Sequence, residues 1–392
     1  MAGQRSSPSP AHGEVSAPDG WAPIARACAK LLTQIDVLAE RVAGAVVSEV
    51  DAYRDFDFPI SESRALVHAQ GSACLVGLAE RRPPTEEVKR AAFAFGQDRA
   101  RSGIPLHALT SALQVGFREL VTELLPLIPV RDRNLLVEAI TLMWTWLHET
   151  SESTAQGYES ESRRQSALMA QTQERFVDAL RRGDVAAEEL RQLSRQLGFD
   201  PDGQFRVAWS RASFDQDLLS SLFENVDGVA CAVIRGLDVI VVTQRIDVEQ
   251  VERNLAAVEG SLGIGLVRPG LEGAHASMID AELCIDLAEA TGASPIRFER
   301  DWLRVVLFAR RAHLAPILEA GIDTFRAHPH IAEAALVFGA SGFVQSEAAR
   351  RLHLRPNSLN YRLQRWKELT GHDVSTSEGL AFIELSSICA NE

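Results

Sequence analysis

Six basic side chains near the C-terminal end give the clearest sign of chemistry in this sequence. They lie between Ala348 and Lys367, a stretch that contains no Asp or Glu. A run of cations without neighbouring carboxylates can contact successive phosphates, which is the chemistry of nucleic-acid binding. The six residues are Arg350, Arg351, Arg355, Arg362, Arg365 and Lys367.

The net charge of the whole chain makes this basic stretch informative. Among 392 residues, 53 are Asp or Glu and 40 are Lys or Arg, so the formal net charge at pH 7 is -13. A uniformly acidic surface repels DNA phosphates, and a nucleic-acid-binding role therefore requires a local basic patch. The stretch 348–367 meets that requirement.

The pattern over residues 346–370 predicts two short helices joined by a tight turn, which is a helix-turn-helix. Leu352 and the alanines before it give the first helix a small apolar face. Leu354 is the apolar residue of the turn, and Pro356 restarts a helix because proline is tolerated in a first turn. We expect Asn357 to cap the second helix.

The second helix has one apolar face and one polar face. Leu359, Leu363 and Trp366 share the face expected to pack inward. The opposite face, with Ser358, Tyr361, Arg362 and Arg365, can present side chains to base edges while flanking cations bind phosphates. The residues predicted to contact DNA are Arg350, Arg351, Arg355, Asn357, Ser358, Asn360, Tyr361, Arg362, Arg365 and Lys367.

Upstream, from Trp21 to about Thr150, the spacing of apolar residues is helical. Seven of them recur every three or four residues and predict one continuous helix, either a bundle helix or one that pairs across a dimer axis. These seven are Cys28, Leu31, Ile35, Leu38, Val42, Val46 and Val50. Further helices are predicted at residues 61–81, 85–102, 106–125 and 130–149.

Residues 157–182 are polar, with only a thin apolar seam at Met169, Thr172, Phe176 and Leu180. Such a helix buries little surface within one chain. We therefore interpret it as a connecting helix. A dimeric coiled coil is one arrangement that would bury its apolar seam.

Strands and helices alternate between residues 204 and 300, which predicts an α/β domain. Strands are expected at 205–209, 263–267 and 296–298. Residues 229–234 and 239–242 predict a β-hairpin around Gly236. Helices are expected at 248–259 and 274–291.

The predicted fold class is a multidomain, mostly α protein with one α/β domain. The N-terminal tail is rich in Ser, Pro and Gly and is expected to be disordered. The expected divisions are a tail at 1–20, a helical sensor-like domain at 21–156, connecting helices at 157–198, the α/β domain at 199–300, and a helical C-terminal region at 301–392 with the helix-turn-helix at 346–370.

Few residues suggest any other chemistry. The five cysteines are scattered without a CxxC pair, and the sequence has no GxSxG, HExxH or phosphate-binding Gly-rich loop. His68, His107 and His148 could each serve a haem in a globin-like helical fold, but a lone helical histidine is more often a surface residue. His328 and His330 flank a proline and fit a loop better than a metal site. We expect no cofactor, no metal and no enzyme activity.

The run AARRLHLRPNSLNYRLQRWKELTGHDV resembles the C-terminal helix-turn-helix of PucR/CdaR-type bacterial transcriptional regulators. Two positions depart from the family pattern, because Arg355 stands for the usual His and Ser358 for the usual Thr. The hydroxyl and a hydrogen-bond donor are kept, so the resemblance implies DNA binding with a different preferred operator. The matching residues are Ala349, Leu352, Leu354, Asn357, Leu359, Tyr361, Arg362, Leu363, Leu369, Thr370 and Gly371.

Two upstream regions resemble other parts of these regulators. GIGLVRPGLEGAHASMIDAELCIDLAEATG is similar to the end of their degenerate GGDEF-like domain, and DRARSGIPLHALTSALQVGFREL to the helical domain of RsbR-type stress proteins. The catalytic turn of an active cyclase corresponds here to residues 235–239, where Asp238 is the one carboxylate. One carboxylate leaves Mg²⁺ and phosphates largely without partners, so the resemblance implies a structural or sensing domain.

The sequence therefore predicts a transcriptional regulator that binds double-stranded DNA through its C-terminal hairpin under the control of upstream sensory domains. We expect a homodimer or higher homo-oligomer, an unidentified small-molecule effector, no membrane contact and a cytoplasmic location. The alternative is a stress-signalling scaffold in which the C-terminal helices contact a protein instead of DNA.

Overall fold

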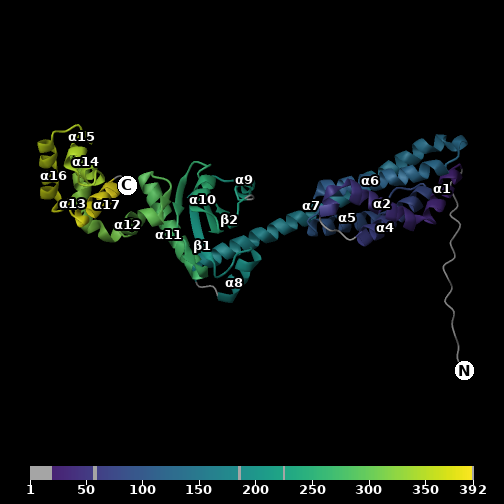
Figure 1. The fold of residues 1–392 in the computed structure, drawn as a ribbon, viewed down its shortest axis with the longest axis horizontal. Helices are drawn as coiled ribbons and strands as arrows, with labels where there is room; N and C mark the ends of the chain where they lie inside the picture. Colours follow the sequence, from purple (N-terminus) through teal and green to yellow (C-terminus); the bar gives the residue numbers. More distant parts are fainter. Residues whose placement is uncertain (1–19, 56–59, 184–186, 224–225, 391–392) are drawn as a thin grey trace, which may run out of the picture. The chain divides into compact units, whose positions relative to one another are not determined.

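The computed structural model describes residues 20–55, 60–183, 187–223 and 226–390. Apart from Gly20, the predicted N-terminal tail lies outside these ranges. The chain divides into two compact units, 1–168 and 169–392, and each is described by itself. The fold is mostly helical with one small mixed sheet, which confirms the predicted fold class (Figure 1).

Unit 1 is built from helices around one apolar core, which includes Trp21, Leu78 and Met143. Thr85 caps α5 through its side-chain oxygen, which accepts from the Val88 N–H, as the predicted start of that helix requires. The elements are α1 (Ala22–Leu32), α2 (Ile35–Glu49), α3 (Asp51–Asp55), α4 (Ile60–Ala79), α5 (Glu86–Arg101), α6 (Leu106–Leu124), η1 (Leu125–Leu127), η2 (Val130–Asp132) and the first part of α7 (Asn134–Arg182).

The apolar stripe from Cys28 to Val50 belongs to two helices, so the prediction of one continuous helix is wrong. α1 ends at Leu32 and α2 begins at Ile35. The Thr33 hydroxyl donates to the Lys30 carbonyl at 2.7 Å, a local bond of the kind with which Thr competes against helix continuation. All seven stripe residues are nevertheless buried, because both helices face the same core.

In α7 the opposite error occurs, because the two helices predicted at 130–149 and 157–182 are joined in one helix of 49 residues that begins at Asn134, after the short 3₁₀ turn η2. The segment between them contains Ser, Thr, Glu, Gln and Ala but no proline, so nothing in it stops a helix. Gly157 lies inside the helix, and its backbone packs so closely on α5 that a Cβ would meet the Phe93 carbonyl oxygen at 2.0 Å.

The α/β part of unit 2 has the sheet order β2-β3-β1-β4-β6, with β5 paired to β1. All pairs are antiparallel except β4 with β6. α9 was not predicted, and the strand expected at 263–267 begins two residues earlier. The elements are α8 (Ala187–Gln196), β1 (Gln204–Arg211), α9 (Gln216–Ser221), β2 (Val229–Arg235), β3 (Asp238–Gln244), α10 (Val248–Leu255), β4 (Ser261–Ile264), β5 (Arg268–Pro269), α11 (Gly270–Thr291) and β6 (Ile296–Arg297).

The last turns of α7 belong to the core of this α/β part. Phe176 and Leu180 are fully buried there, and Phe176 stacks on Phe199 with ring centroids 5.5 Å apart. The prediction that these two residues extend a coiled-coil seam is therefore wrong. An apolar seam in the sequence shows only that this face of the helix must be buried. Here the α/β part of the same chain buries it.

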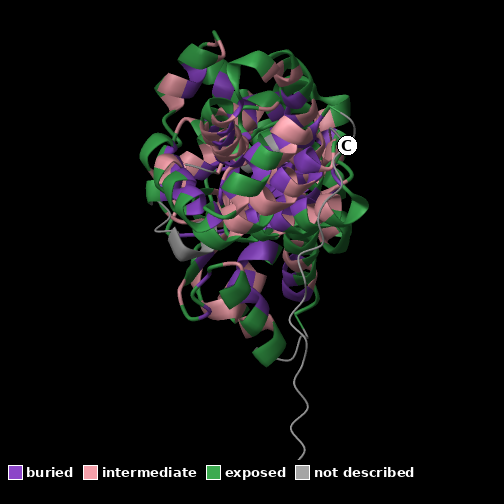
Figure 2. Ribbon diagram, turned by 90° about the vertical axis from the view of Figure 1, so that its right-hand side faces the viewer, coloured by how far each residue is buried: buried purple, intermediate pink, exposed green. Residues whose placement is uncertain are grey.

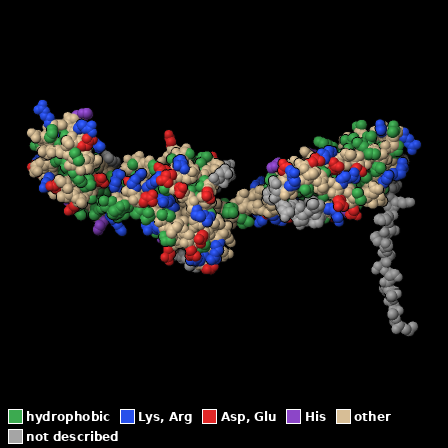
Figure 3. Space-filling view, viewed as in Figure 1, with side chains coloured by type: hydrophobic (Ala, Val, Ile, Leu, Met, Phe, Trp, Pro, Cys, Tyr) green, Lys and Arg blue, Asp and Glu red, His purple; other side chains and the backbone are tan. Residues whose placement is uncertain are grey.

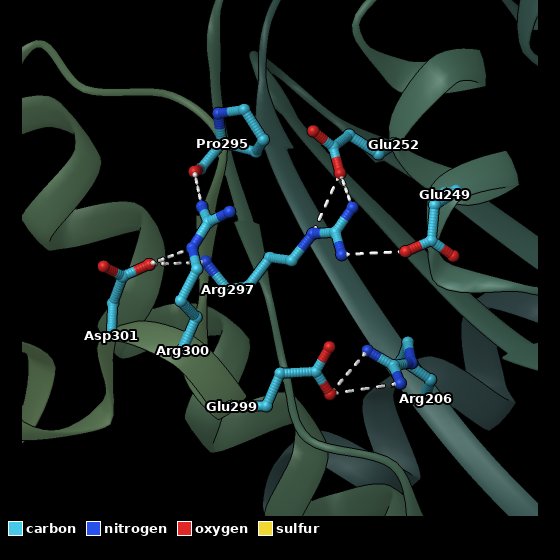
Figure 4. Close-up of polar contacts among 8 residues, drawn as sticks. All are labelled: Arg206, Glu249, Glu252, Pro295, Arg297, Glu299, Arg300 and Asp301. Atoms are coloured by element: carbon cyan, nitrogen blue, oxygen red, sulfur yellow. Dashed lines mark hydrogen bonds and ion pairs between the residues drawn. The ribbon is translucent and has the colours of Figure 1, made fainter.

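An ion-pair network connects the sheet to the first C-terminal helix, α12 (Phe298–Ala309) (Figure 4). Arg297 on β6 pairs with Glu252 and, at 3.1 Å, with Glu249, both on α10. Arg206 on β1 lies 3.4 Å from Glu299 in the first turn of α12. These contacts fix where α12 leaves the sheet.

The C-terminal helices share a core that includes Phe308, Leu359 and Trp366. The helices of unit 1, which face the viewer in Figure 2, show buried and exposed stretches alternating along their length, as amphipathic helices require. None of the described helices has the length and apolar character needed to cross a lipid bilayer. The helices after α12 are α13 (Arg311–Ala327), α14 (Pro329–Ala340), α15 (Gln345–Arg351), α16 (Pro356–Thr370) and α17 (Ser377–Ala390).

The close contact of α5 with α7 yields a stability prediction. A Cβ at Gly96 would lie 1.9 Å from the Thr154 carbonyl oxygen, so Gly96→Ala forces two backbones apart and should cost about 1–3 kcal/mol. Gly44 on α2 has no atom within 4 Å of the same position, so Gly44→Ala should stabilise by about 0.5–1 kcal/mol. Urea unfolding of both variants measures the difference. Equal effects would contradict the close packing.

Candidate nucleic-acid interface

Two helices and a four-residue turn form the C-terminal hairpin, α15–α16. The alanine face of α15 is packed away, with Ala348 and Ala349 buried. His353 takes a left-handed conformation with φ +53°, and the Leu354 N–H donates to the Ala349 carbonyl at 2.8 Å. This arrangement is a tight helix end, and it reverses the chain into α16 within a few residues.

Inside the hairpin, α16 is anchored by large apolar side chains. Leu359 and Trp366 are fully buried, and Leu363 is half-buried. The Trp366 ring lies between those of Phe325 on α13 and Phe382 on α17, at centroid distances of 5.9 and 6.1 Å. The predicted inward face of α16 is therefore correct, and Trp366 fixes the rotation of the helix about its axis.

The residue that caps α16 differs from the prediction. Arg355 is at the N-cap position with an extended backbone, and Pro356 is the first helical residue. Because proline supplies the helical φ at that position, the cap falls one residue before it, and Asn357 lies within the first turn. The expectation that Asn357 caps the helix is wrong, and its side chain is exposed instead.

Polar side chains cover the outer face of α16. Tyr361 is 71% exposed and projects from the centre of this face. The side-chain oxygen Oδ1 of Asn360 accepts a hydrogen bond from Gln345 Nε2 at the start of α15, which braces the two helices against each other. The exposed residues among those predicted to contact DNA are Arg350, Arg351, Arg355, Asn357, Ser358, Asn360, Tyr361, Arg365 and Lys367.

Arg362 differs from the other predicted contact residues. It is half-buried at the flank of α16, and its Nη1 donates to the His330 carbonyl at 3.2 Å. His330 lies in the first turn of α14, which begins at Pro329, so the expectation that His330 belongs to a loop is wrong. Arg362 therefore lies at the edge of the outer face and helps to hold α16 against α14.

Most cations of the hairpin form ion pairs with carboxylates just outside the acid-free stretch. Glu347 binds Arg350 at 2.6 Å and Arg351 at 3.1 Å, and hydrogen bonds from both arginines lower the pKa of Glu347. Figure 3 shows basic and histidine side chains projecting at the α15 end of the hairpin. Two further pairs are Arg365 with Glu368 and Lys367 with Asp373, both at 2.9 Å.

These ion pairs are exposed, with the arginine and lysine side chains 46–77% accessible. Exposed pairs contribute about 0–1 kcal/mol each, so an incoming phosphate can replace the carboxylate at little cost. Arg355 is exposed and has no ion pair within the described part of unit 2. In the hairpin, Arg355 is thus a cation without an ion pair among the described residues of unit 2. Four further cations can exchange their carboxylate partners for another anion at little cost.

The turn of the β2–β3 hairpin is the other place where the sequence suggested a lost catalytic site. Gly236 there has φ +64°, as a tight turn requires. The Asp238 carboxylate accepts from the Trp209 indole N–H at 3.0 Å and from Arg211 Nε at 2.9 Å. Its oxygen is therefore committed to holding β3 against β1. Among the described residues, no group of three or more His, Cys, Asp or Glu could hold a metal ion.

The left-handed turn residue gives a testable expectation for the hairpin. Ala at position 353 places a Cβ in a conformation that costs about 1–2 kcal/mol, whereas Gly adopts it freely. His353→Gly should therefore protect the α16 amides more strongly from hydrogen exchange than His353→Ala. At Gln364, in the regular part of α16, the order should reverse, because Gly weakens a helix interior by about 1 kcal/mol. If the Gly variant gave the stronger protection at both positions, or the Ala variant did, the left-handed conformation of residue 353 would be contradicted.

Three domain families match this chain, in an order that follows its architecture. They are the RsbT co-antagonist protein rsbRD N-terminal domain at residues 36–173, the GGDEF-like domain at 182–287 and the PucR C-terminal helix-turn-helix domain at 332–387. The last match contains all of α15 and α16. The PucR helix-turn-helix match is a regulator-type domain, and the GGDEF-like match identifies a fold.

Among the similar solved structures is a chain described as a regulator of polyketide synthase expression from Bifidobacterium adolescentis. It is 15% identical, with a TM-score of 0.33, over 55% of this chain and 91% of that one. Comparison with curated proteins gives no significant match. The three matched domains confirm the architecture predicted from the sequence, with an RsbRD-type N-terminal domain, a GGDEF-like middle domain and a PucR-type C-terminal helix-turn-helix domain.

Proposed function

We propose that this regulator binds double-stranded DNA by placing α16 in the major groove. The observation that carries the proposal is the division of α16 into two faces. Leu359 and Trp366 are completely buried, while Ser358 and Tyr361 on the other side are exposed. A recognition helix needs this division, because it must be held rigidly by its scaffold and still present side chains to base edges.

The exposed residues divide into two roles by their positions. Asn357, Ser358 and Tyr361 lie in the first turns of α16, which in a helix-turn-helix approach the bases. Arg350 and Arg351 lie at the end of α15, and with Arg355, Arg365 and Lys367 they supply charge for phosphates on either side of the groove. Arg362, held at the flank by His330, fits a phosphate contact better than a base contact.

The middle domain has a structural or sensing role in this proposal. The carboxylate in its hairpin turn already accepts two hydrogen bonds from its own sheet, which leaves little to bind a metal. Control of the hairpin by the upstream domains would then pass through α7, whose two ends contribute to the cores of both units.

We also propose a homodimer that joins through the middle of α7. Residues 163–171 are exposed on every side of the helix, and Leu168 and Met169 are 48% and 50% exposed. Pairing with a second copy would cover these side chains, as in a short coiled coil. Two hairpins related by a two-fold axis would then meet a two-fold operator.

The alternative, a scaffold that contacts a protein, makes a different prediction about salt. A protein that neutralises several phosphates loses DNA affinity steeply as salt rises, because bound counterions are released. We expect the full-length protein to protect specific genomic DNA in footprinting at low salt. Its affinity for that DNA should fall by about 10³-fold between 50 and 200 mM salt. Salt-independent or absent DNA binding would favour the scaffold.

Substitutions in the hairpin should separate the two roles. Arg355→Ala should weaken binding to all sequences alike and reduce the slope of log K against log salt by about 1, because one phosphate contact is lost. Tyr361→Ala should cost about 1–3 kcal/mol on the operator and much less on unrelated DNA. Fluorescence anisotropy at several salt concentrations measures both. Arg326→Ala, an exposed arginine on α13, is the matched control and should bind as the unsubstituted protein does.

A charge placed in the exposed seam of α7 should test the dimer. Met169→Glu puts a carboxylate where the two copies would meet, so we expect monomers in analytical ultracentrifugation and at least tenfold weaker operator binding. Ala170→Glu adds the same charge about 100° further around the helix, away from both Leu168 and Met169, and should leave the dimer intact. A monomeric unsubstituted protein, or equal effects of the two changes, would contradict the proposed interface.

A further inference from the structure

One helix of unit 2, α12, carries apolar side chains on the face that its own fold leaves uncovered. Trp302, Leu303 and Val306 are 55%, 50% and 44% exposed. Val306 lies three residues after Leu303 and four after Trp302, so the three side chains are neighbours on the surface of the helix. We call these three residues the α12 patch. Figure 3 shows hydrophobic side chains gathered on the surface over α12.

The α12 patch is large for a surface that faces water. A tryptophan side chain buries about 150–250 Å² when it is covered, so the three partly exposed side chains leave on the order of 300 Å² of apolar surface open. That is in the range of the largest apolar patch on a typical monomeric protein, and such a patch is often functional. Val305 and Phe308 already anchor α12 in the core from its other side. The packing of unit 2 therefore does not explain why the outer face is apolar.

Two side chains of opposite charge lie at the ends of the patch. Glu299 lies one turn before Trp302, and Arg310, the C-cap residue of α12, lies one turn after Val306. The distance from Glu299 to Arg310 is about three helical turns, so both charged residues lie on the same face as the patch. Both are exposed. This face of the helix therefore consists of a carboxylate, an apolar centre and a guanidinium, in that order.

We propose that the α12 patch binds the same patch of a second copy of this chain, with the two helices antiparallel. A two-fold axis between Leu303 and Val306 would place the Glu299 carboxylate of each copy opposite the Arg310 guanidinium of the other. The apolar centres would then cover each other. A contact between identical surfaces must be self-complementary, and the order of charges on this face meets that requirement in the antiparallel arrangement. In a parallel arrangement like charges would meet, which disfavours it.

The size of the contact determines its strength. Two patches of about 300 Å² with their charged ends bury less than the roughly 1,200–2,000 Å² of a stable interface. The contact is therefore weak by itself, and it forms readily only between copies that another contact already joins, because the effective concentration is then high. The inference deepens the proposed homodimer, on which it rests, by adding a second contact between the two copies.

This second contact would act on the C-terminal hairpins. Phe308 of α12 and Trp366 of α16 belong to the same apolar core. Pairing of α12 with α12 would therefore fix the separation of the two recognition helices, and that separation must match the half-site spacing of a two-fold operator.

Cross-linking through an introduced cysteine detects the contact in the full-length protein without DNA. Packed helices lie about 8–10 Å apart, so a short bismaleimide should join the thiols of two Leu303→Cys copies. We expect at least tenfold more covalent dimer on a denaturing gel than from Leu237→Cys, since Leu237 is an equally accessible leucine, 68% exposed, in the β2–β3 turn. That turn adjoins the Arg211 end of β1, whereas Glu299 of α12 contacts Arg206 at the other end. Equal yields from the two variants would overturn the proposal and point to a different partner for the patch.

A charge reversal tests the antiparallel arrangement. In the Leu303→Cys protein, Arg310→Glu would place a carboxylate opposite Glu299 of the other copy, so the yield of covalent dimer should fall at least fivefold at low salt. It should recover at about 1 M salt, where the Debye length is about 3 Å. Arg326→Glu makes the same change at an exposed position in the last turn of α13 and should leave the yield unchanged. Equal effects of the two reversals, or a loss that salt does not restore, would overturn the pairing of Glu299 with Arg310.

The outcomes separate this inference from the proposed DNA binding. Specific cross-linking of Leu303→Cys without salt-dependent DNA binding would retain the α12 contact and contradict the DNA-binding function. A dimer that binds operator DNA but gives no specific cross-link would retain that function and overturn the α12 contact. If both hold, Leu303→Glu should weaken operator binding at least fivefold, whereas Leu237→Glu should leave it unchanged.

Discussion

The hydrogen-bonded continuity of α7 is the constraint on which much of this structure depends. Near its start, Met143 and Trp146 belong to the core of unit 1, and near its end Phe176 and Leu180 belong to the core of the α/β part of unit 2. The same helix therefore contributes side chains to the core of each unit. The polar stretch between them owes its helical form to the packing at both ends, since isolated helices of that composition are marginal.

The charge environment of the C-terminal hairpin depends on which side chains the fold brings together, and the composition of the sequence does not reveal it. The acid-free stretch of the hairpin lies in a protein with a formal net charge of -13. The carboxylates of Glu347, Glu368 and Asp373, which lie outside this stretch in the sequence, form ion pairs with its cations in the fold. Such exposed pairs keep the hairpin compatible with the acidic remainder of the chain. They also leave its cations available to a polyanion, because a phosphate can take the place of each carboxylate.

The two hairpins of unit 2 show how similar local geometry can serve different ends. In the sheet, the turn carboxylate Asp238 is tied to Trp209 and Arg211, so the turn contributes to stability. In the C-terminal hairpin, the strained residue His353 reverses the chain so that Trp366 can be buried while Tyr361 remains exposed. The polar side chain of the β2–β3 turn is bonded within the sheet, whereas the turn before α16 leaves the polar residues of that helix exposed to solvent.

The sequence by itself determined the features that local chemistry controls. These include the helix start at Thr85, the β-hairpin around Gly236, the inward face of α16 and the family resemblance of the C-terminal hairpin. Only the tertiary structure decided which partner covers each face. It placed Phe176 and Leu180 in a domain core instead of a dimer seam and brought Arg362 to His330. Periodicity reports that a face must be buried, but contacts between distant parts of the chain determine what buries it.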